Sequence, residues 1–306
     1  MTESSSHASQ ARTRHEPGTS SGARLFIILQ RLLPQHALSR VVHRIARARS
    51  PVLKNALIKA FVRAFRPEMD GACEPNPLNY PSFNSLFTRE LAAGARPIDR
   101  DPRAVVSPVD GTVSQIGYLD GRSIVQAKGR TYELDALLCQ RDAWVERLAG
   151  GAFATLYLAP RNYHRIHMPL AGELRGAWYV PGRLFSVNEA TAGAVPELFA
   201  RNERVVCAFE TPSALPFAMV LVGALFVGSI ATVWHGDVTP CSPRRARALS
   251  VAASGDGLDK GEELGRFNMG STVVILFPPG SVSWLPELAP GSPIRMGQRL
   301  ARLTSP

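Results

Sequence analysis

The chain has 306 residues, which is enough for one large domain or two small ones. Apolar residues make up 45% and charged residues 20%, a balance that excludes a protein disordered throughout. The net charge of +10 comes from residues 1–66, which hold 12 Lys and Arg but only two acids, whereas residues 67–306 hold 23 of each sign. This basic arm predicts a polyanionic partner, either nucleic acid or an anionic membrane surface.

Two segments precede any sign of a folded core. Residues 1–22 are rich in Ser, Thr, Arg and His and have no apolar run, so we expect a disordered tail and not a signal peptide. Residues 23–66 carry ten Lys and Arg without an acid, and apolar residues recur there at helical spacing, most clearly over 52–65. We predict two or three basic amphipathic helices that dock on an anionic membrane. Helices that only pack on the domain, or that bind nucleic acid, are the alternatives.

The rest of the chain changes character twice. Residues 67–82 hold four prolines and are predicted to be a linker, and FNSLFTREL (83–91) is predicted to begin with a short helix. From residue 104 onward short β-branched runs alternate with Gly and Pro, with helical pieces at 133–149 and 193–200. The sequence therefore predicts an α+β protein, with N-terminal amphipathic helices followed by a β-rich, barrel- or sandwich-like catalytic domain.

One apolar segment tests this interpretation. Residues 216–234 form a run of 19 residues without a charge, which is about the length that spans a membrane. The run contains Gly223 and Gly228 and is rich in Val and Ile, so a buried strand, turn and strand is the better interpretation.

Three short motifs carry groups that could do chemistry. They are SPVDG (107–111), YHRIHMP (163–169) and GRFNMGSTV (265–273). Taken singly, each has an ordinary explanation: a turn, structural histidines, and a turn that enters a strand. Together they offer an acid, a histidine and a serine preceded by glycine, the set that can activate a hydroxyl. No metal site is predicted, because the two histidines lack a third ligand and the four cysteines are scattered without a CxxC pair.

At these motifs the chain resembles the bacterial phosphatidylserine decarboxylases, pyruvoyl-dependent enzymes made as self-cleaving proenzymes. The resemblance runs from about residue 24 to 303 and includes QAKGRTYELDALL, YVPGRLFSVN, LFARNERV and GSIATVW in the family's order. One departure is Met269, where the family usually has Leu. This exchange keeps an apolar side chain of similar volume beside the reacting pair.

The resemblance implies a cut between Gly270 and Ser271, which divides the catalytic domain (83–306) and gives a large chain, 1–270, and a small chain, 271–306. Ser271 would become the covalent pyruvoyl group, the only cofactor expected. Asp110 and His167 match the family's acid and base for self-cleavage, with Asp110 holding the imidazole.

His164 matches the histidine of the decarboxylation step. The amine of phosphatidylserine would form a Schiff base with the pyruvoyl ketone. The substrate would be converted to phosphatidylethanolamine and CO2, which is a step of phospholipid biosynthesis. Arg201 and Arg204 are guessed to contact the phosphate.

The expected partners are the phosphatidylserine substrate and an anionic membrane surface, with no nucleic acid. The two chains should stay associated as a peripheral protein on the cytoplasmic face of the cell membrane, and a homodimer is left open. Two alternatives are a Ser-His-Asp hydrolase without self-cleavage and a catalytically inactive membrane-binding relative. Residues 104–114 and 293–303 also resemble the two ends of a biotinyl- or lipoyl-carrier barrel, without a lysine in a matching turn.

Overall fold

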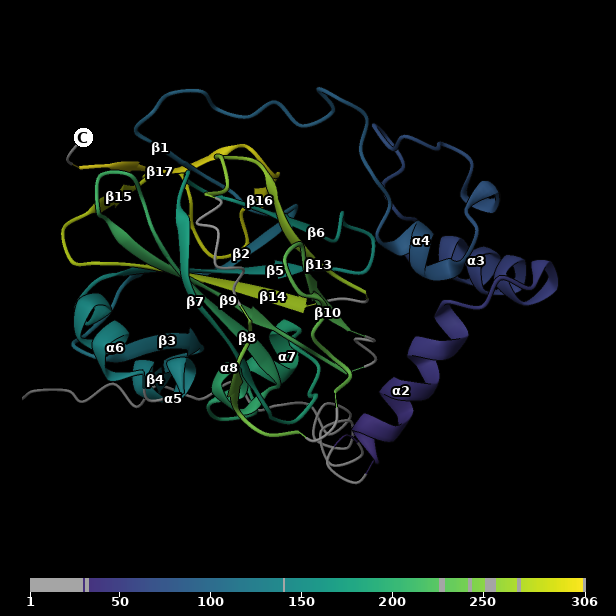
Figure 1. Cartoon of the computed structure of the whole chain (residues 1–306), viewed down its shortest axis with the longest axis horizontal. Helices are drawn as coiled ribbons and strands as arrows, with labels where there is room; N and C mark the ends of the chain where they lie inside the picture. Colours follow the sequence, from purple (N-terminus) through teal and green to yellow (C-terminus); the bar gives the residue numbers. More distant parts are fainter. Residues whose placement is uncertain are drawn as a thin grey trace, which may run out of the picture.

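The computed structural model describes residues 30, 33–139, 141–225, 229–241, 244–250, 257–268 and 271–304. The tail predicted for residues 1–22 lies outside this part of the chain. Helices and strands follow one another in the order that the sequence predicts: helices come first, and a β-rich body follows (Figure 1). The protein is therefore α+β, as expected.

Two basic helices open the described chain and stand beside the β-rich body (Figure 1). Helix α2 (Gln35–Ala46) begins after Pro34, and α3 (Pro51–Phe65) begins with a proline. Proline is tolerated at this position because the N–H groups of the first turn make no hydrogen bond within the helix. The predicted linker contains a short 3-10 helix, η1 (Pro77–Asn79), and leads to α4 (Phe83–Phe87), which Ser82 caps.

An aromatic cluster joins the N-terminal helices to one another. Ile58 and Phe61 of α3 are buried against Phe83 and Phe87 of α4. The ring centroid of Phe61 lies 5.1 Å from that of Phe83 and 5.7 Å from that of Phe87. One face of α3 thus packs on the protein, as one of the sequence-based alternatives holds, while its other face remains exposed.

The body contains the predicted strands and several that the sequence did not indicate. The strands are β1 (Ala104–Val106), β2 (Gly111–Tyr118), β3 (Ser123–Ala127), β4 (Arg130–Glu133), β5 (Ala152–Leu158), β6 (Arg165–His167), β7 (Glu173–Val180), β8 (Arg204–Glu210), β9 (Pro216–Val222), β10 (Ile230–Thr232), β11 (Gly236–Asp237), β12 (Arg247–Ala248), β13 (Glu263–Phe267), β14 (Ser271–Phe277), β15 (Val282–Trp284), β16 (Pro293–Ile294) and β17 (Arg299–Leu303).

The largest sheet has eight strands in the order β12-β7-β8-β9-β14-β5-β2-β16, and its neighbouring strands are antiparallel. Side chains alternate between its two faces. In β14, Val273, Ile275 and Phe277 enter one apolar core, whereas Val274 and Leu276 enter another. Both faces are therefore buried, which explains why the central strands are almost entirely apolar.

Helices cover one face of this sheet and smaller sheets cover the other. The first face carries α5 (Leu134–Leu138), α6 (Asp142–Leu148), α7 (Glu189–Ala192), α8 (Leu198–Arg201) and the β3–β4 hairpin (Figure 1). The second face packs against residues of the sheets β11-β10-β13-β6 and β1-β17-β15. The helices predicted at 133–149 and 193–200 are thus present in shorter form.

The apolar segment 216–234 forms strands β9 and β10, as predicted. Among the described residues, none of the helices combines the length and apolarity that crossing a membrane requires.

The two segments that resemble the ends of a carrier barrel do pair, β1 with β17 and β2 with β16. The described sheets nevertheless have open strand orders, so the expected closure into a barrel is absent from them and the sandwich-like arrangement holds.

Candidate active site

Ser271 begins the central strand of the large sheet. Strand β14 pairs with β5 on one side and β9 on the other, and Ser271 stands opposite Leu158 of β5. The side chain is fully buried, and its Oγ has no hydrogen-bond partner among the described residues. A buried hydroxyl without a partner calls for an explanation, and Ser271 shares this property with a few other buried hydroxyls, such as that of Thr272. Its expected cleavage partner, Gly270, lies outside the described residues.

His164 lies just before strand β6 and is completely buried. Its Nδ1 is 2.9 Å from the carbonyl oxygen of Asn162. Because a carbonyl can only accept, Nδ1 must carry the hydrogen, and the lone pair is on Nε2. That Nε2 has no partner within the described chain. Burial lowers the pKa of His164 to about 3, so the ring is neutral at physiological pH.

Phe87 packs on this imidazole, and Arg89 shares its hydrogen-bond acceptor. The ring centroids of Phe87 and His164 are 4.1 Å apart. The buried guanidinium of Arg89 donates to the carbonyl oxygens of Glu68, Arg161 and Asn162, and the last of these is the oxygen that His164 also binds. The FNSLFTREL segment therefore supplies an aromatic ring and a cation to the site.

His167 has both ring nitrogens occupied. Its Nδ1 donates to the carbonyl oxygen of Gly261 at 2.9 Å, so its Nε2 accepts the hydrogen bond from the Tyr163 hydroxyl, also at 2.9 Å. Burial lowers the pKa of His167 and raises that of Tyr163, so both side chains are uncharged at neutral pH.

Asp110 follows β1 and precedes β2, and its buried carboxylate is bound by Arg96. The Nε of Arg96 donates to Oδ1 at 3.0 Å and its Nη2 to Oδ2 at 2.5 Å, while the backbone N–H of Met296 donates to Oδ1 at 2.8 Å. The structure therefore does not bring Asp110 into the hydrogen-bonding contact with His167 that the sequence suggested. Its negative charge still acts at longer range and favours the protonated form of His167.

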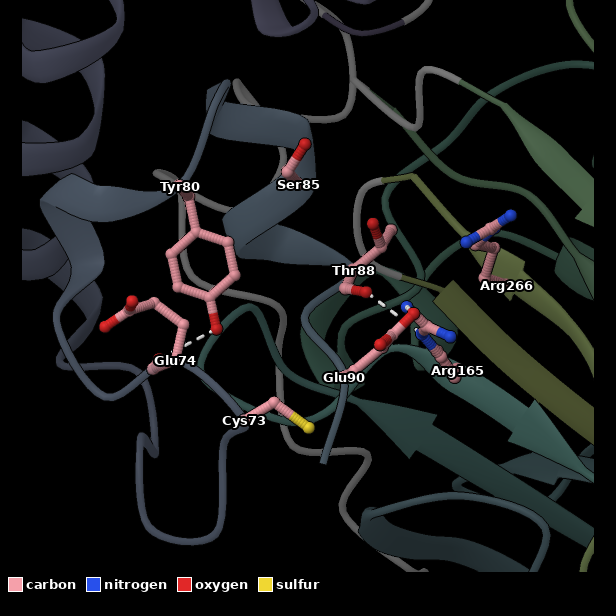
Figure 2. A pocket seen from close by; sticks show the side chains of 8 residues that line it. All are labelled: Cys73, Glu74, Tyr80, Ser85, Thr88, Glu90, Arg165 and Arg266. Atoms are coloured by element: carbon pink, nitrogen blue, oxygen red, sulfur yellow. Dashed lines mark hydrogen bonds and ion pairs between the residues drawn. The ribbon is translucent and has the colours of Figure 1, made fainter. Parts of the chain in front are cut away.

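A cavity of about 320 Å³ lies beside helix α4 (Figure 2). Arg165, which directly follows His164, forms one wall, where it binds the carbonyl oxygen of Thr88 and the carboxylate of Glu90. Arg165 also pairs with Glu263 of β13 at 2.7 Å. The cavity thus carries charges of both signs, but the four residues predicted to be catalytic do not line it.

The phosphate contacts guessed for Arg201 and Arg204 are not supported for Arg204. Its buried guanidinium donates to four backbone carbonyl oxygens, those of Ala136, Leu137, Ala200 and Asn202. Burial lowers its pKa to about 10, which still leaves it charged at neutral pH. Arg201 is exposed and lies 3.7 Å from Glu197. Arg204 is therefore a structural residue that caps the ends of backbone segments.

Arg89, Arg96 and Tyr163 were not assigned a role from the sequence. Arg89 binds carbonyl oxygens more than 70 residues along the chain, which no local pattern indicates, whereas Tyr163 binds His167 within its own motif. Over the described residues, no group of three or more His, Cys, Asp or Glu side chains is arranged to bind a metal ion.

Comparisons with known proteins agree with the resemblance. A family model described as phosphatidylserine decarboxylase matches residues 83–302, and a second, described as PSD, matches residues 25–66. The phosphatidylserine decarboxylase proenzyme of Pseudomonas fluorescens is 52% identical over 281 residues, which are 90% of this chain and 96% of the relative. The proenzymes of Methylococcus capsulatus and Bordetella pertussis are 47% and 50% identical, each over 90% of this chain and over 96% and 94% of their own lengths.

Proposed function

This chain belongs to the phosphatidylserine decarboxylase family, and we propose that it cleaves itself between Gly270 and Ser271 and then converts phosphatidylserine to phosphatidylethanolamine and CO2. It is a lyase proenzyme of phospholipid biosynthesis. The observation that carries the proposal is the Ser271 hydroxyl, which is buried and unpartnered among the described residues at the start of the central strand.

Self-cleavage begins when the Ser271 hydroxyl attacks the carbonyl carbon of Gly270 and displaces the amide nitrogen, so that an ester replaces the peptide bond. Elimination then releases the carboxylate of Gly270 and leaves dehydroalanine at position 271, which water hydrolyses to the pyruvoyl ketone and ammonia. His167 takes the proton of the Ser271 hydroxyl. Its Nε2 first gives up the hydrogen bond from the Tyr163 hydroxyl and accepts one from the Ser271 hydroxyl instead. The hydrogen bond from Nδ1 to Gly261 keeps the ring in the tautomer that leaves Nε2 basic. Asp110 stabilises the charged imidazole through its negative charge.

The pyruvoyl group that Ser271 would supply fits this site, because its position is buried and the lone pair of His164 is also free of partners among the described residues. The group offers an electrophilic carbonyl that can accept the substrate amine and withdraw electrons from the bond to the carboxylate. The chain needs no other cofactor for this chemistry.

His164 moves the proton that decarboxylation requires. The Nε2 of His164, which is free of partners among the described residues, delivers a proton to the carbon that has lost CO2. Because burial lowers the pKa of His164, the protonated ring gives up this proton readily. The hydrogen bond from Nδ1 to Asn162 keeps the ring oriented for this transfer.

Helices α2 and α3 dock the protein on the membrane that holds its substrate. Their apolar residues Val41, Ile45, Val52, Leu53 and Phe65 expose between 40% and 82% of their surface. The same helices contain basic residues and no acid. Exposed apolar groups among basic ones favour an anionic lipid surface, here the cytoplasmic face of the cell membrane, on which the protein is peripheral.

The test is a denaturing gel combined with intact-mass measurement of the purified chain. We expect two polypeptides, 1–270 and 271–306, the smaller with a blocked pyruvoyl terminus, and one uncut polypeptide for Ser271→Ala. A single uncut wild-type chain that hydrolyses esters would instead indicate a Ser-His-Asp hydrolase. An uncut chain without activity would indicate an inactive relative.

A further inference from the structure

A cluster of polar side chains holds the chain just ahead of the proposed cleavage point. We call it the Asn268 cluster, and it consists of Asn268, Ser229, Asp237, Asn84 and Arg47. The Asn268 Nδ2 donates to the Ser229 Oγ at 2.8 Å, and the Asn268 Oδ1 accepts from the Asn84 Nδ2 at 3.1 Å. The backbone N–H of Asn268 also donates to the carbonyl oxygen of Ser229 at 2.9 Å.

The cluster extends from Ser229 to helix α2. The Ser229 Oγ donates to Asp237 Oδ1 at 2.9 Å, and Asp237 accepts two hydrogen bonds from Arg47, at 3.1 and 2.9 Å. His43 of α2 lies 3.7 Å from the same carboxylate, and burial lowers its pKa below the usual range. Three separate parts of the fold, α2, α4 and the β10–β11 hairpin, thus meet at one asparagine. In Figure 1, β10 and β13 lie on the side of the body that faces α2 and α4.

Asn268 lies close to the proposed cleavage point in the sequence, so the cluster can fix the backbone there. Asn268 follows β13 directly, and two residues separate it from Ser271. On the far side, β14 fixes Ser271 through its pairing with β5. Attack on a peptide carbonyl by the next residue's hydroxyl requires a narrow range of backbone torsions, so fixing both flanks favours the reactive geometry.

We propose that Asn268 is a positioning residue for self-cleavage and that the Arg47–Asp237 pair ties helix α2 to it. This inference rests on the proposed function and names a residue that acts through the backbone instead of on the reacting atoms. Asparagine suits the position because one side chain must donate to Ser229 and accept from Asn84 at the same time. Aspartate has a similar shape, but it lacks the donor and would place a second carboxylate beside Asp237, since Asn268 Nδ2 is only 3.5 Å from Asp237 Oδ1.

The experiment follows pulse-labelled full-length chains on denaturing gels and measures the rate constant of self-cleavage. We expect Asn268→Ala and Asn268→Asp to cut about ten-fold more slowly or worse. Asp237→Ala should slow cutting less, because the direct bonds between Asn268 and Ser229 remain. Two controls remove a side-chain hydrogen bond or ion pair at the surface instead: Asn79→Ala, whose side chain binds Glu74, and Asp135→Ala, which pairs with Arg122. Both controls should cut at the wild-type rate.

Two further measurements separate positioning from general destabilisation. The thermal midpoint of each variant, measured in the Ser271→Ala background, should stay within a few degrees of that background. The decarboxylation rate per molecule of cut Asn268→Ala should equal that of wild type, because the cluster has no task after the cut. Wild-type cutting rates in the Asn268 variants would overturn the inference. So would a slowing matched by equal losses of stability and of decarboxylation. Neither result would affect the proposed function, which instead fails if Ser271→Ala is cut.

Discussion

The carbonyl oxygen of Asn162 receives hydrogen bonds from two buried side chains, Nδ1 of His164 and Nη2 of Arg89. Because the oxygen can only accept, it fixes the tautomer of His164 and leaves the lone pair on Nε2. His167 has the same tautomer, but its Nε2 is occupied by Tyr163. The two histidines therefore differ in what their basic nitrogens can reach, which is the physical basis for giving them different tasks.

Alanine substitutions should separate the two roles. We expect His164→Ala to be cut normally and to decarboxylate at least about 100-fold more slowly, since a positioned acid–base group contributes 10²–10⁴-fold. We expect His167→Ala to remain uncut. A denaturing gel and a CO2-release assay measure the two steps independently. If His164→Ala is the variant that remains uncut, the assignments must be exchanged.

The burial of His164 also predicts how stability depends on pH. Its pKa is about 3 in the folded protein and near 6.5 in the unfolded chain, so the unfolded state binds more protons between these values. The stabilising contribution is complete above pH 6.5 and decreases as the pH falls. For His164 alone the loss between pH 7 and pH 5 is about 2 kcal/mol.

Urea unfolding of the uncut Ser271→Ala chain at pH 7 and pH 5 measures this loss. The same chain with His164→Asn as a second change should lose about 2 kcal/mol less over that interval. Equal losses in the two chains would show that His164 is not held neutral in the folded state.

At the scale of elements, helices α2 and α3 present an apolar surface that the rest of the described protein does not cover. Arg40, Arg44 and Arg63 are exposed on the same two helices. Each basic residue near an anionic surface is worth about 1 kcal/mol. Changing all three to Gln should therefore weaken binding to phosphatidylserine-containing vesicles by up to about 100-fold, without changing self-cleavage.

Cosedimentation with anionic and neutral vesicles measures this effect. The control carries Arg100→Gln, Arg130→Gln and Arg295→Gln, which remove three exposed charges from the body instead. If both triple variants lose affinity equally, net charge and not the helical surface determines docking.

Local sequence patterns located most elements but not their pairing. Apolar periodicity identified α3, β5, β8, β9 and β14, because these segments are long and strongly patterned. Strand β6 was missed because its three residues carry two charged or titratable side chains and become a strand only by pairing with β13. Element type is encoded locally in such runs, whereas short strands depend on a partner far along the chain.

The sequence motifs locate the residues proposed to react, but not the partners of those residues. Ser271, His164 and His167 stand in recognisable motifs. Nothing local indicates that Asp110 binds Arg96, or that Arg204 ends in a ring of carbonyl oxygens and not on a phosphate. An arginine's neighbours depend on tertiary contacts, so residue type alone cannot distinguish a buried cap from a ligand-binding group.

At the scale of the whole molecule, the proposed cut falls within a continuous core. Every residue of β14 is buried between β5 and β9, and β16 and β17 pair with β2 and β1 of the large chain. The small chain of 36 residues would thus lose its covalent link to the large chain and remain bound to it through the pairing of three strands.

We therefore expect the cut protein to behave as one particle. Under native conditions the two chains should elute together from a size-exclusion column, at the volume of the uncut Ser271→Ala chain of 33.2 kDa. They should separate only in denaturant. Separate elution of chains under native conditions would contradict this account of the sheet.

The close, tilted packing of Phe87 on His164 also has a spectroscopic consequence. An aromatic ring whose centroid lies 4.1 Å away shifts the resonances of the imidazole protons by its ring current. Phe87 in turn packs on Phe61 of α3, the helix that would meet the lipid. The NMR signal of a single histidine thus reports, without any added label, on whether α3 and α4 keep their places when the protein meets a bilayer.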